Sequence, residues 1–437
     1  MHQEVDFLII RGMILTLDDH ESTLDSGDIA IRGDTILDIG SNLAEKYHGR
    51  QVIDASDKLV MPGLINTHTH AAMTLFRGLA DDLTLGDWLQ DHIFPAEARY
   101  MTPENVYLGT LLACIEMIKS GTTTLCDGYF FESEAAQAVH DAGLRGVMAQ
   151  GIIDFPCADA KDPQEGWQRS EEFIRRWRNS DRIRPALFCH SAYTCSPGTL
   201  RRAKDLAQNY AIPLFLHLAE TRQEVEYIEQ QYGKRPVIHV ADLGILDEKT
   251  VAVHCVWLNS KEIDLLHHHK VRVVHVPESN MKLASGIAPV PALLQKGVPV
   301  GLGTDGSASN NDLDLFLEMD TAAKLHKVAL HDPAVMRAKA VVHMATREGA
   351  RVIGMDREIG KLAAGKKADI ILLDLKKPHL LPLYNVYSHL VYTFSGADVS
   401  SVIAGGKMLM KDRRLLHLDE NDVLERVKKL AIQIQEG

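Results

Sequence analysis

The feature that constrains this fold most is a regular alternation of short apolar runs with longer helical stretches between about positions 59 and 355. Such alternation is typical of βα units, in which helices join parallel strands. Eight runs have the character of buried strands, and eight is the number that closes a (β/α)8 barrel. They are 60–67, 122–126, 146–150, 183–189, 213–216, 250–253, 272–274 and 298–304. Capping residues before proline, at Thr102-Pro103 and Asp332-Pro333, predict the start of two helices.

The two ends of the chain differ from this alternating segment. Short apolar runs flank the Arg32-Gly33-Asp34 turn and the Gly405-Gly406 turn, as in β-hairpins. We therefore expect residues 1–58 and 361–437 to form one small β-sandwich domain, and residues 59–360 to form the barrel. The apolar residues between 423 and 434 follow a 3.6-residue period, which predicts an amphipathic helix in the last segment.

Charge and composition argue against several classes of partner. The chain has 59 acidic and 47 basic residues, and its net charge of −12 repels nucleic acid and anionic membranes. No apolar run approaches the ~18 residues of a membrane helix, and Glu4 and Asp6 stand where a signal peptide carries basic and apolar residues. Six cysteines without a Cys-x-x-Cys pair predict reduced thiols. We expect a cytoplasmic protein, and whether it forms a homo-oligomer stays open.

Metal-binding residue types follow six of the predicted strands. They are His68, His70, His190, His217, His254, His275 and Asp305. Because the carboxyl ends of barrel strands lie on one face, we expect these side chains to converge there. His68 and His70 can bind one ion together, His217 adds a third nitrogen, and Asp305 adds a carboxylate oxygen. This donor set predicts one divalent metal ion with a position left for water; zinc is favoured, and iron and manganese stay open.

Two segments resemble the amidohydrolase superfamily. Its first-strand signature is similar to the run VMPGLINTHTH at 60–70, and its return to a flanking β domain is similar to GKLAAGKKAD at 360–369. The resemblance extends over essentially the whole chain. It implies a (β/α)8 metal hydrolase with a small β-sandwich built from both termini.

The resemblance also implies a single metal. Members with two metals bridge them with a carboxylated lysine or a glutamate at the end of the fourth strand, where this chain has Phe188-Cys189-His190. Mononuclear members that are similar to this chain are mostly deaminases. His190 is then free to contact the substrate.

Two further site residues, and a second role for Asp305, follow from the same resemblance. Glu220 stands three residues after His217, beyond the strand, so its carboxylate can lie over the open metal position. In the deaminases that the chain resembles, this glutamate moves protons to the ring nitrogen and the leaving amine; without such neighbours it would be an ordinary glutamate at a helix N-terminus. His254 matches the histidine that orients the attacking water, and Asp305 is expected to share its proton.

One loop resembles that of deaminases acting on 5′-methylthioadenosine and S-adenosylhomocysteine. It is DDLTLGDWL at 81–89, followed by IFPAE at 93–97. There the glutamate, here Glu97, accepts hydrogen bonds from both ribose hydroxyls, and the tryptophan, here Trp88, packs over the nucleoside. Trp88 could also simply anchor the loop. Some members hold the tail of S-adenosylhomocysteine with arginines near the third strand, and residues 150–160 contain none, which favours 5′-methylthioadenosine or a similar compound.

The expected function is hydrolytic deamination at C6 of a 5′-substituted adenosine, giving the inosine analogue and ammonia; adenosine itself stays open as a substrate. Two alternatives remain. The same metal site could deaminate guanine, 8-oxoguanine or a pterin, or hydrolyse a triazine. The second alternative is a non-catalytic barrel that serves as a scaffold. Such a protein is expected to lack metal ligands, whereas all four are present here.

Overall fold

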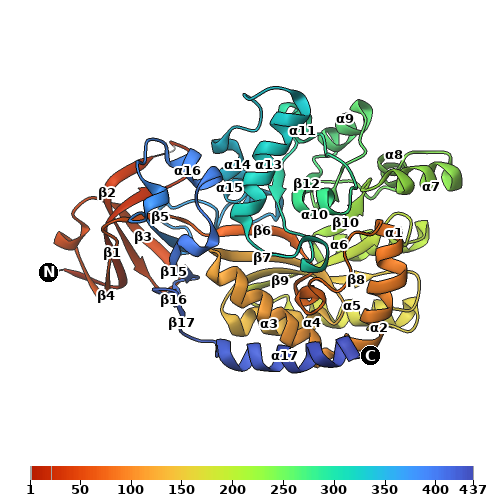
Figure 1. Cartoon of the computed structure of the whole chain (residues 1–437), viewed down its shortest axis with the longest axis horizontal. Coiled ribbons are helices and arrows are strands. Elements are labelled where there is room, and N and C mark those ends of the chain that lie inside the picture. Colours follow the sequence, from red (N-terminus) through yellow and green to blue (C-terminus); the bar gives the residue numbers. More distant parts are fainter. Residues whose placement is uncertain (1, 21, 437) are drawn as a thin grey trace.

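Two sheets organise the computed structural model, which describes residues 2–20 and 22–436 (Figure 1). Eight consecutive parallel strands form the first sheet, in simple sequence order. They are β6 (Leu64–Thr69), β7 (Thr122–Tyr129), β8 (Arg145–Ile152), β9 (Ile183–Ser191), β10 (Leu214–Leu218), β11 (Thr250–His254), β12 (Arg272–His275) and β13 (Val300–Leu302). Their side chains are almost entirely buried, as in parallel sheets covered on both faces.

The first and last of these strands meet and close the barrel. Thr69 and Asp305 form a parallel bridge, and the backbone N–H groups of Thr304 and Asp305 both donate to the carbonyl of His68 at 3.1 Å. Thr67 Oγ1 donates to the carbonyl of Leu302 at 2.7 Å. Closure therefore places the residues after β6 beside those after β13.

Helices connect the barrel strands and cover the outside of the barrel (Figure 1). Within the two described stretches, none combines the length and apolar character needed to cross a membrane. The larger ones are α3 (Pro103–Lys119), α4 (Glu132–Ala142), α5 (Pro163–Trp177), α6 (Pro197–Tyr210), α7 (Arg222–Tyr232), α8 (Pro236–Asp242), α9 (Ser260–His268), α11 (Val290–Lys296), α13 (Leu315–Leu330), α14 (Ala338–Met344), α15 (Arg347–Val352), α16 (Val386–Tyr392) and α17 (Glu420–Glu436). Short elements near the strand ends are η2 (Ala71–Phe76), α1 (Leu85–Asp87), η3 (Trp88–Ile93), α2 (Phe94–Tyr100), α10 (Pro277–Lys282) and α12 (Ser307–Asn310).

Strands from both ends of the chain form the second sheet, at the left of Figure 1. They are β1 (Gln3–Leu15), β2 (Thr23–Arg32), β3 (Thr35–Gly40), β4 (Tyr47–Asp54), β5 (Lys58–Pro62), β14 (Ile370–Asp374), β15 (Val399–Ala404), β16 (Lys407–Lys411) and β17 (Arg414–Leu415). The N-terminal and C-terminal parts join where β5 pairs antiparallel with β14. The predicted fold class, a (β/α)8 barrel with a separate β unit from both termini, is confirmed. The predicted terminal helix is α17, which packs on α3.

Two local predictions were wrong. The run 60–67, taken as one strand, is two: β5 belongs to the terminal sheet and β6 to the barrel. The break falls at Gly63, where a Cβ atom would lie 2.1 Å from Thr123 Oγ1, so only glycine fits. Asp332-Pro333 does not begin a helix, because the chain turns between α13 and α14 and Asp332 accepts from Ala334 N in that turn.

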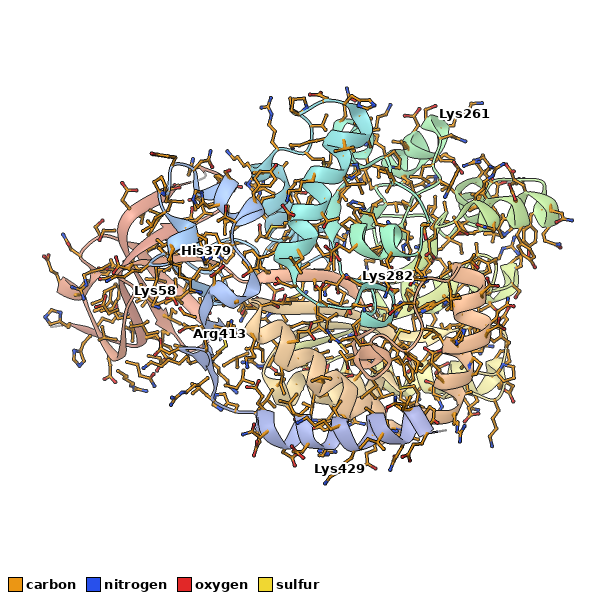
Figure 2. All side chains as sticks on the ribbon, in the orientation of Figure 1. Lys58, Lys261, Lys282, His379, Arg413 and Lys429 are labelled. Atoms are coloured by element: carbon orange, nitrogen blue, oxygen red, sulfur yellow. The ribbon has the colours of Figure 1, made fainter. Side chains whose placement is uncertain are left out.

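Polar side chains connect strands within the terminal sheet and connect this sheet to the barrel. Figure 2 labels two of them, Lys58 and Arg413. Lys58 joins β5 to Asp374 of β14 through an ion pair of 2.5 Å. Arg413 Nη1 donates to the carbonyl of Lys119, at the end of α3, at 2.6 Å. The N-terminal and C-terminal parts are thus held against the same side of the barrel.

A buried ion pair also joins the barrel to the terminal sheet. Arg145, which begins β8, donates from Nε to Asp369 Oδ2 at 3.1 Å, and both side chains are 4% exposed. Asp369 Oδ1 also accepts from the backbone N–H of Gly405 at 2.5 Å. We expect Asp369→Ala to lower the free energy of unfolding by about 3–5 kcal/mol, because it leaves a buried guanidinium unpaired.

Denaturant titration measures this loss. The matched control is Glu226→Ala, which breaks the exposed Arg222–Glu226 pair on α7 and should cost less than about 1 kcal/mol. Equal losses in the two variants would contradict a special role for the buried pair.

Candidate active site

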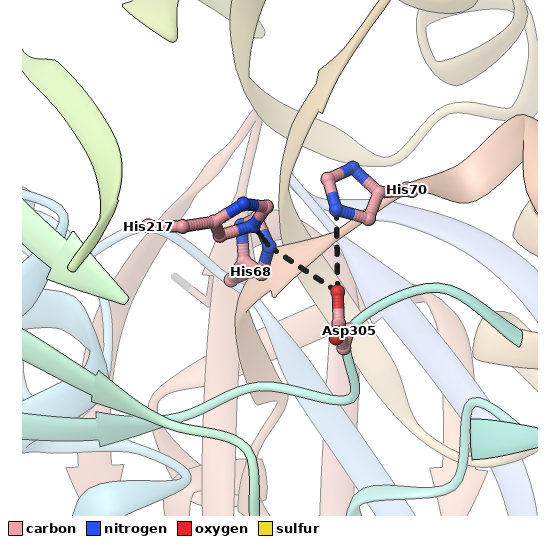
Figure 3. A group of neighbouring side chains, drawn as sticks. All are labelled: His68, His70, His217 and Asp305. Carbon is pink, nitrogen blue, oxygen red and sulfur yellow. Dashed lines mark hydrogen bonds and ion pairs between the residues drawn. The ribbon is translucent and has the colours of Figure 1, made fainter. Parts of the chain in front are cut away.

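Four side chains predicted as metal ligands lie together at the carboxyl end of the barrel (Figure 3). The ligand atoms of His68, His70, His217 and Asp305 all lie within 4.8 Å of one another. Asp305 Oδ1 lies 3.2 Å from His70 Nε2 and 3.5 Å from His68 Nε2. The Nε2 atoms of His68 and His217 are 3.3 Å apart. Three imidazole nitrogens and one carboxylate oxygen thus face a common centre.

Neighbouring groups fix the direction of these ligands. His70 Nδ1 lies 2.6 Å from the carbonyl of Gly128, which leaves Nε2 to face the centre. Asp305 Oδ2 accepts from Ser279 Oγ at 2.7 Å and from Ser309 Oγ at 3.2 Å, so Oδ1 faces the histidines. Such second contacts are typical of metal ligands.

The protonation of the cluster suits a divalent cation. Burial lowers the pKa of His68 to about 4 and holds that of His217 well below its ordinary value, which favours the neutral, ligating imidazole. Burial alone would raise the pKa of Asp305, but hydrogen bonds from His68 and His70 hold it well below its usual range. Burial would lower the pKa of His70 too, but its hydrogen bond and charge contact with Asp305 outweigh burial and raise it to about 8, so a metal ion would displace a proton from this histidine. Neutral imidazoles and an ionised carboxylate are the donors that zinc binds in catalytic sites. The residues present therefore fit the predicted metal.

Strained turns follow the strands that carry the site. Ala219, His254, Cys255 and Asp305 all have positive φ, between 50° and 71°. This conformation costs about 1–3 kcal/mol per residue outside glycine and clusters at functional sites. Glu220, His254 and Asp305 lie in or directly beside these turns.

Glu220 and His254 lie beside the metal ligands and close to each other. His254 Nε2 is 3.7 Å from Glu220 Oε2, and His217, Glu220 and His254 also form a compact group of possible ligands. Asn280 Oδ1 lies 2.9 Å from His254 Nδ1, so Nε2 faces Glu220. Ser285 Oγ donates to Glu220 Oε1 at 3.4 Å. Burial raises the pKa of Glu220, which makes it easier to protonate than an exposed glutamate.

A pocket opens over these groups. Apolar and aromatic side chains make up much of its lining and a few polar groups converge on it, as in small-molecule sites. The predicted substrate-binding residues Trp88, Glu97 and His190 all line it, together with His70, His217, Glu220, His254 and Asp305. Tyr129 Oη donates to Glu97 Oε1 at 2.5 Å. Burial raises the pKa of Glu97 to about 7 and lowers that of His190 to about 3.

The comparisons with known proteins agree with this geometry. The model of the amidohydrolase family matches residues 59–409. The chain belongs to the amidohydrolase family. The 5-methylthioadenosine/S-adenosylhomocysteine deaminase 1 of Syntrophus aciditrophicus is 49% identical to this amidohydrolase over 100% of this chain and 99% of the relative. The 5′-deoxyadenosine deaminase of Methanosarcina acetivorans is 45% identical over 98% of each chain. The resemblance inferred from the sequence is confirmed.

Solved amidohydrolase structures share the fold. An adenosine deaminase from Xanthomonas campestris, solved with bound zinc, has a TM-score of 0.98 and 36% identity over 100% of both chains. The atrazine chlorohydrolase TrzN from Arthrobacter aurescens, also complexed with zinc, has a TM-score of 0.92 at 23% identity over 97% of this chain and 100% of TrzN, which shows the fold alone. The His-His-His-Asp group of this amidohydrolase contains the four predicted ligands and could hold one metal ion.

One predicted member of the cluster lies elsewhere. His275, at the end of β12, is buried, but its Nε2 lies 3.2 Å from Nε2 of His326 on α13, and it does not line the pocket. The prediction that His275 converges with the other strand-end histidines was wrong. Tyr129 was not predicted as a site residue, although it lies in the second barrel strand. Asn280 and Glu224 had no predicted role either.

Proposed function

We propose that this amidohydrolase catalyses hydrolytic deamination at C6 of 5′-substituted adenosines, releasing ammonia and the inosine analogue. The observation that carries the proposal is the position of Glu220, beside the metal ligands in a pocket that also contains Glu97. The carboxylate of Glu220 suits proton transfer to a purine ring, and that of Glu97 suits binding of a ribose diol. The names of the relatives, deaminases of 5′-substituted adenosines, support the same substrate class.

The side chains divide the chemistry between them. His68, His70, His217 and Asp305 would hold a divalent ion, which would make a nucleophile available at neutral pH, because a bound metal lowers the pKa of water from 15.7 to about 7. Glu220 receives a proton from the attacking water and passes it to N1 as the C6–O bond forms. It then helps to deliver a proton to the amine as the C6–N bond breaks. His254, directed by Asn280, orients the attacking oxygen through Nε2 together with Asp305.

The other end of the pocket would hold the nucleoside. The two carboxylate oxygens of Glu97 can accept from the two hydroxyls of the ribose, and Tyr129 Oη directs one of those oxygens. His190, whose Nδ1 lies 3.0 Å from Thr194 Oγ1, would contact the purine through Nε2. Trp88 would pack over the nucleoside from η3.

Replacing Glu97 tests whether the enzyme prefers nucleosides to free bases. We expect Glu97→Gln to lower kcat/KM for 5′-methylthioadenosine by about 10–100-fold, because the amide NH2 group cannot accept from a ribose hydroxyl, and leaving a buried polar group without its partner costs about 1–3 kcal/mol. Steady-state kinetics with 2′,3′-dideoxyadenosine gives the matched control, since this compound has no ribose diol. A loss of the same size on the dideoxy compound would contradict the role of Glu97.

An ammonia-release screen tests the proposed function as a whole. It compares adenosine, 5′-methylthioadenosine, 5′-deoxyadenosine and S-adenosylhomocysteine with guanine, 8-oxoguanine, a pterin and an amino-triazine. We expect the 5′-substituted adenosines to give the highest kcat/KM. Faster turnover of a free base or of the triazine would replace the proposal with the corresponding alternative.

A further inference from the structure

Glu224 makes an unusual pair of hydrogen bonds behind the active site. It is the third residue of α7 and is 4% exposed. Its Oε1 accepts from the backbone N–H of Ala219 at 2.8 Å, and its Oε2 accepts from that of Glu220 at 2.7 Å. Thr221 caps the helix by accepting from Glu224 N at 3.1 Å. One buried carboxylate thus binds two successive peptide groups that precede the helix.

The start of α9 shows the ordinary arrangement for comparison. There Glu262, also the third residue of its helix, accepts from the N–H of the capping residue Asn259 at 2.9 Å, and Asn259 accepts in return. This reciprocal pair is a capping box, which stabilises the end of the helix itself. Glu224 reaches past the capping residue Thr221 instead. Its carboxylate therefore stabilises the turn between His217 and the helix.

That turn has an unfavourable backbone conformation. Ala219 has a φ of 53°, in the left-handed region, without being glycine. Its carbonyl accepts from Val256 N at 3.0 Å and from Trp257 N at 2.8 Å, which ties the turn to the one after β11. With Glu224 on the amide side and these two donors on the carbonyl side, the backbone on either side of Ala219 is fixed.

We propose that Glu224 is a positioning residue for the deamination reaction: by binding the N–H groups of Ala219 and Glu220, it sets the direction of the Glu220 carboxylate toward the substrate. This inference rests on the proposed function for its kinetic consequence. Its structural half, the restraint of the turn, is independent of the substrate. Glu224 does not line the pocket that contains Glu220, although it lines the cavity next to it. Both of its carboxylate oxygens accept from backbone N–H groups, so its effect on the reaction passes through Glu220.

The kinetic test uses Glu224→Gln in the metal-loaded full chain. An amide keeps the volume but offers one acceptor in place of two, and its NH2 group faces a backbone donor. We expect kcat for 5′-methylthioadenosine to fall by about 10–100-fold, with KM changed by less than about threefold and bound metal unchanged. In the Glu220→Gln background the same substitution should cause no further loss, because its effect passes through Glu220.

Glu262→Gln is the matched control: it is buried, at the same helix position and bound to a backbone N–H, but on another helix. We expect it to lower the unfolding temperature and leave kcat unchanged. Wild-type kcat in Glu224→Gln, or losses that multiply in the double variant, would overturn the proposal.

Amide hydrogen exchange separates the proposal from the proposed function. Mass spectrometry of the peptide containing residues 217–221 should show faster exchange at Ala219 and Glu220 in Glu224→Gln, and wild-type exchange in Glu262→Gln. Unchanged exchange in Glu224→Gln overturns the restraint, whatever the substrate is. If exchange rises and the wild-type chain releases no ammonia from any nucleoside, the proposed function fails and the restraint stands.

Discussion

Glu220→Gln should lower kcat for 5′-substituted adenosines by about 10²–10⁴, the range that positioned proton transfer contributes. Glutamine keeps the shape of Glu220 and can still accept from Ser285 Oγ, but it cannot carry a proton from water to N1. Because the metal ligands are other residues, bound metal should stay the same as in the wild-type chain. Ammonia-release kinetics and elemental analysis measure the two quantities on one sample.

The control for this experiment replaces a glutamate that lies outside the pocket. Glu262→Gln changes the same functional group at the start of α9 and should keep wild-type kcat. Wild-type turnover in Glu220→Gln would refute the proton-transfer role. Loss of metal together with turnover would instead assign Glu220 to the metal site, as the group of His217, Glu220 and His254 allows.

His217→Asn should lose most of the bound metal and lower kcat by several orders of magnitude. The substitution removes one of three nitrogens from the cluster of ligands. Without the ion, the pKa of water returns from about 7 toward 15.7, and hydroxide is scarce at neutral pH. Chelation of the wild-type chain should have the same effect, reversed by added zinc, and should lower the unfolding temperature, because a ligand that binds only the folded state stabilises it.

His275→Asn provides the matched comparison, since His275 is also a buried histidine at the end of a barrel strand. It contacts His326 and not the cluster, so metal content and kcat should be retained. Equal metal loss in both variants, or full activity of His217→Asn without metal, would contradict the assignment of the ligands.

Strand ends were predictable from the sequence, but the direction of a side chain at a strand end was only partly so. Phe188 and Phe215 belong to one core cluster inside the barrel. His190 and His217 stand two residues further along the same strands and so point to the same side. These two histidines face the pocket as the alternation of a strand requires.

The histidines after β11 and β12 show where this rule ends. Val253 and Val274 pack inside the barrel, so the next residue of each strand should point outward. His275 does so and meets α13. His254 lies in the pocket because its φ of 71° turns the chain. No local sequence pattern predicts this conformation, because it depends on the backbone hydrogen bonds between the turns after β10 and β11.

Contacts made by loops were the least predictable part of the site. The loop resemblance predicted Glu97 and Trp88 as pocket residues, but Tyr129, the partner of Glu97, comes from the barrel strand β7. The two hydrogen bonds of Glu224 depend on backbone groups exposed by a strained turn. Such contacts depend on how distant segments pack together, and no spacing of residues in the sequence predicts them.

The pairing of β5 with β14 can form only late in translation, because the two strands are far apart in the sequence. When the ribosome has made the first 62 residues, β5 presents an open edge, and its partner is still some 300 residues away. The metal ligands are likewise incomplete until Asp305 has been added. A nascent chain must therefore carry an exposed strand edge until β14 has been made, and an incomplete set of metal ligands until Asp305 has been added.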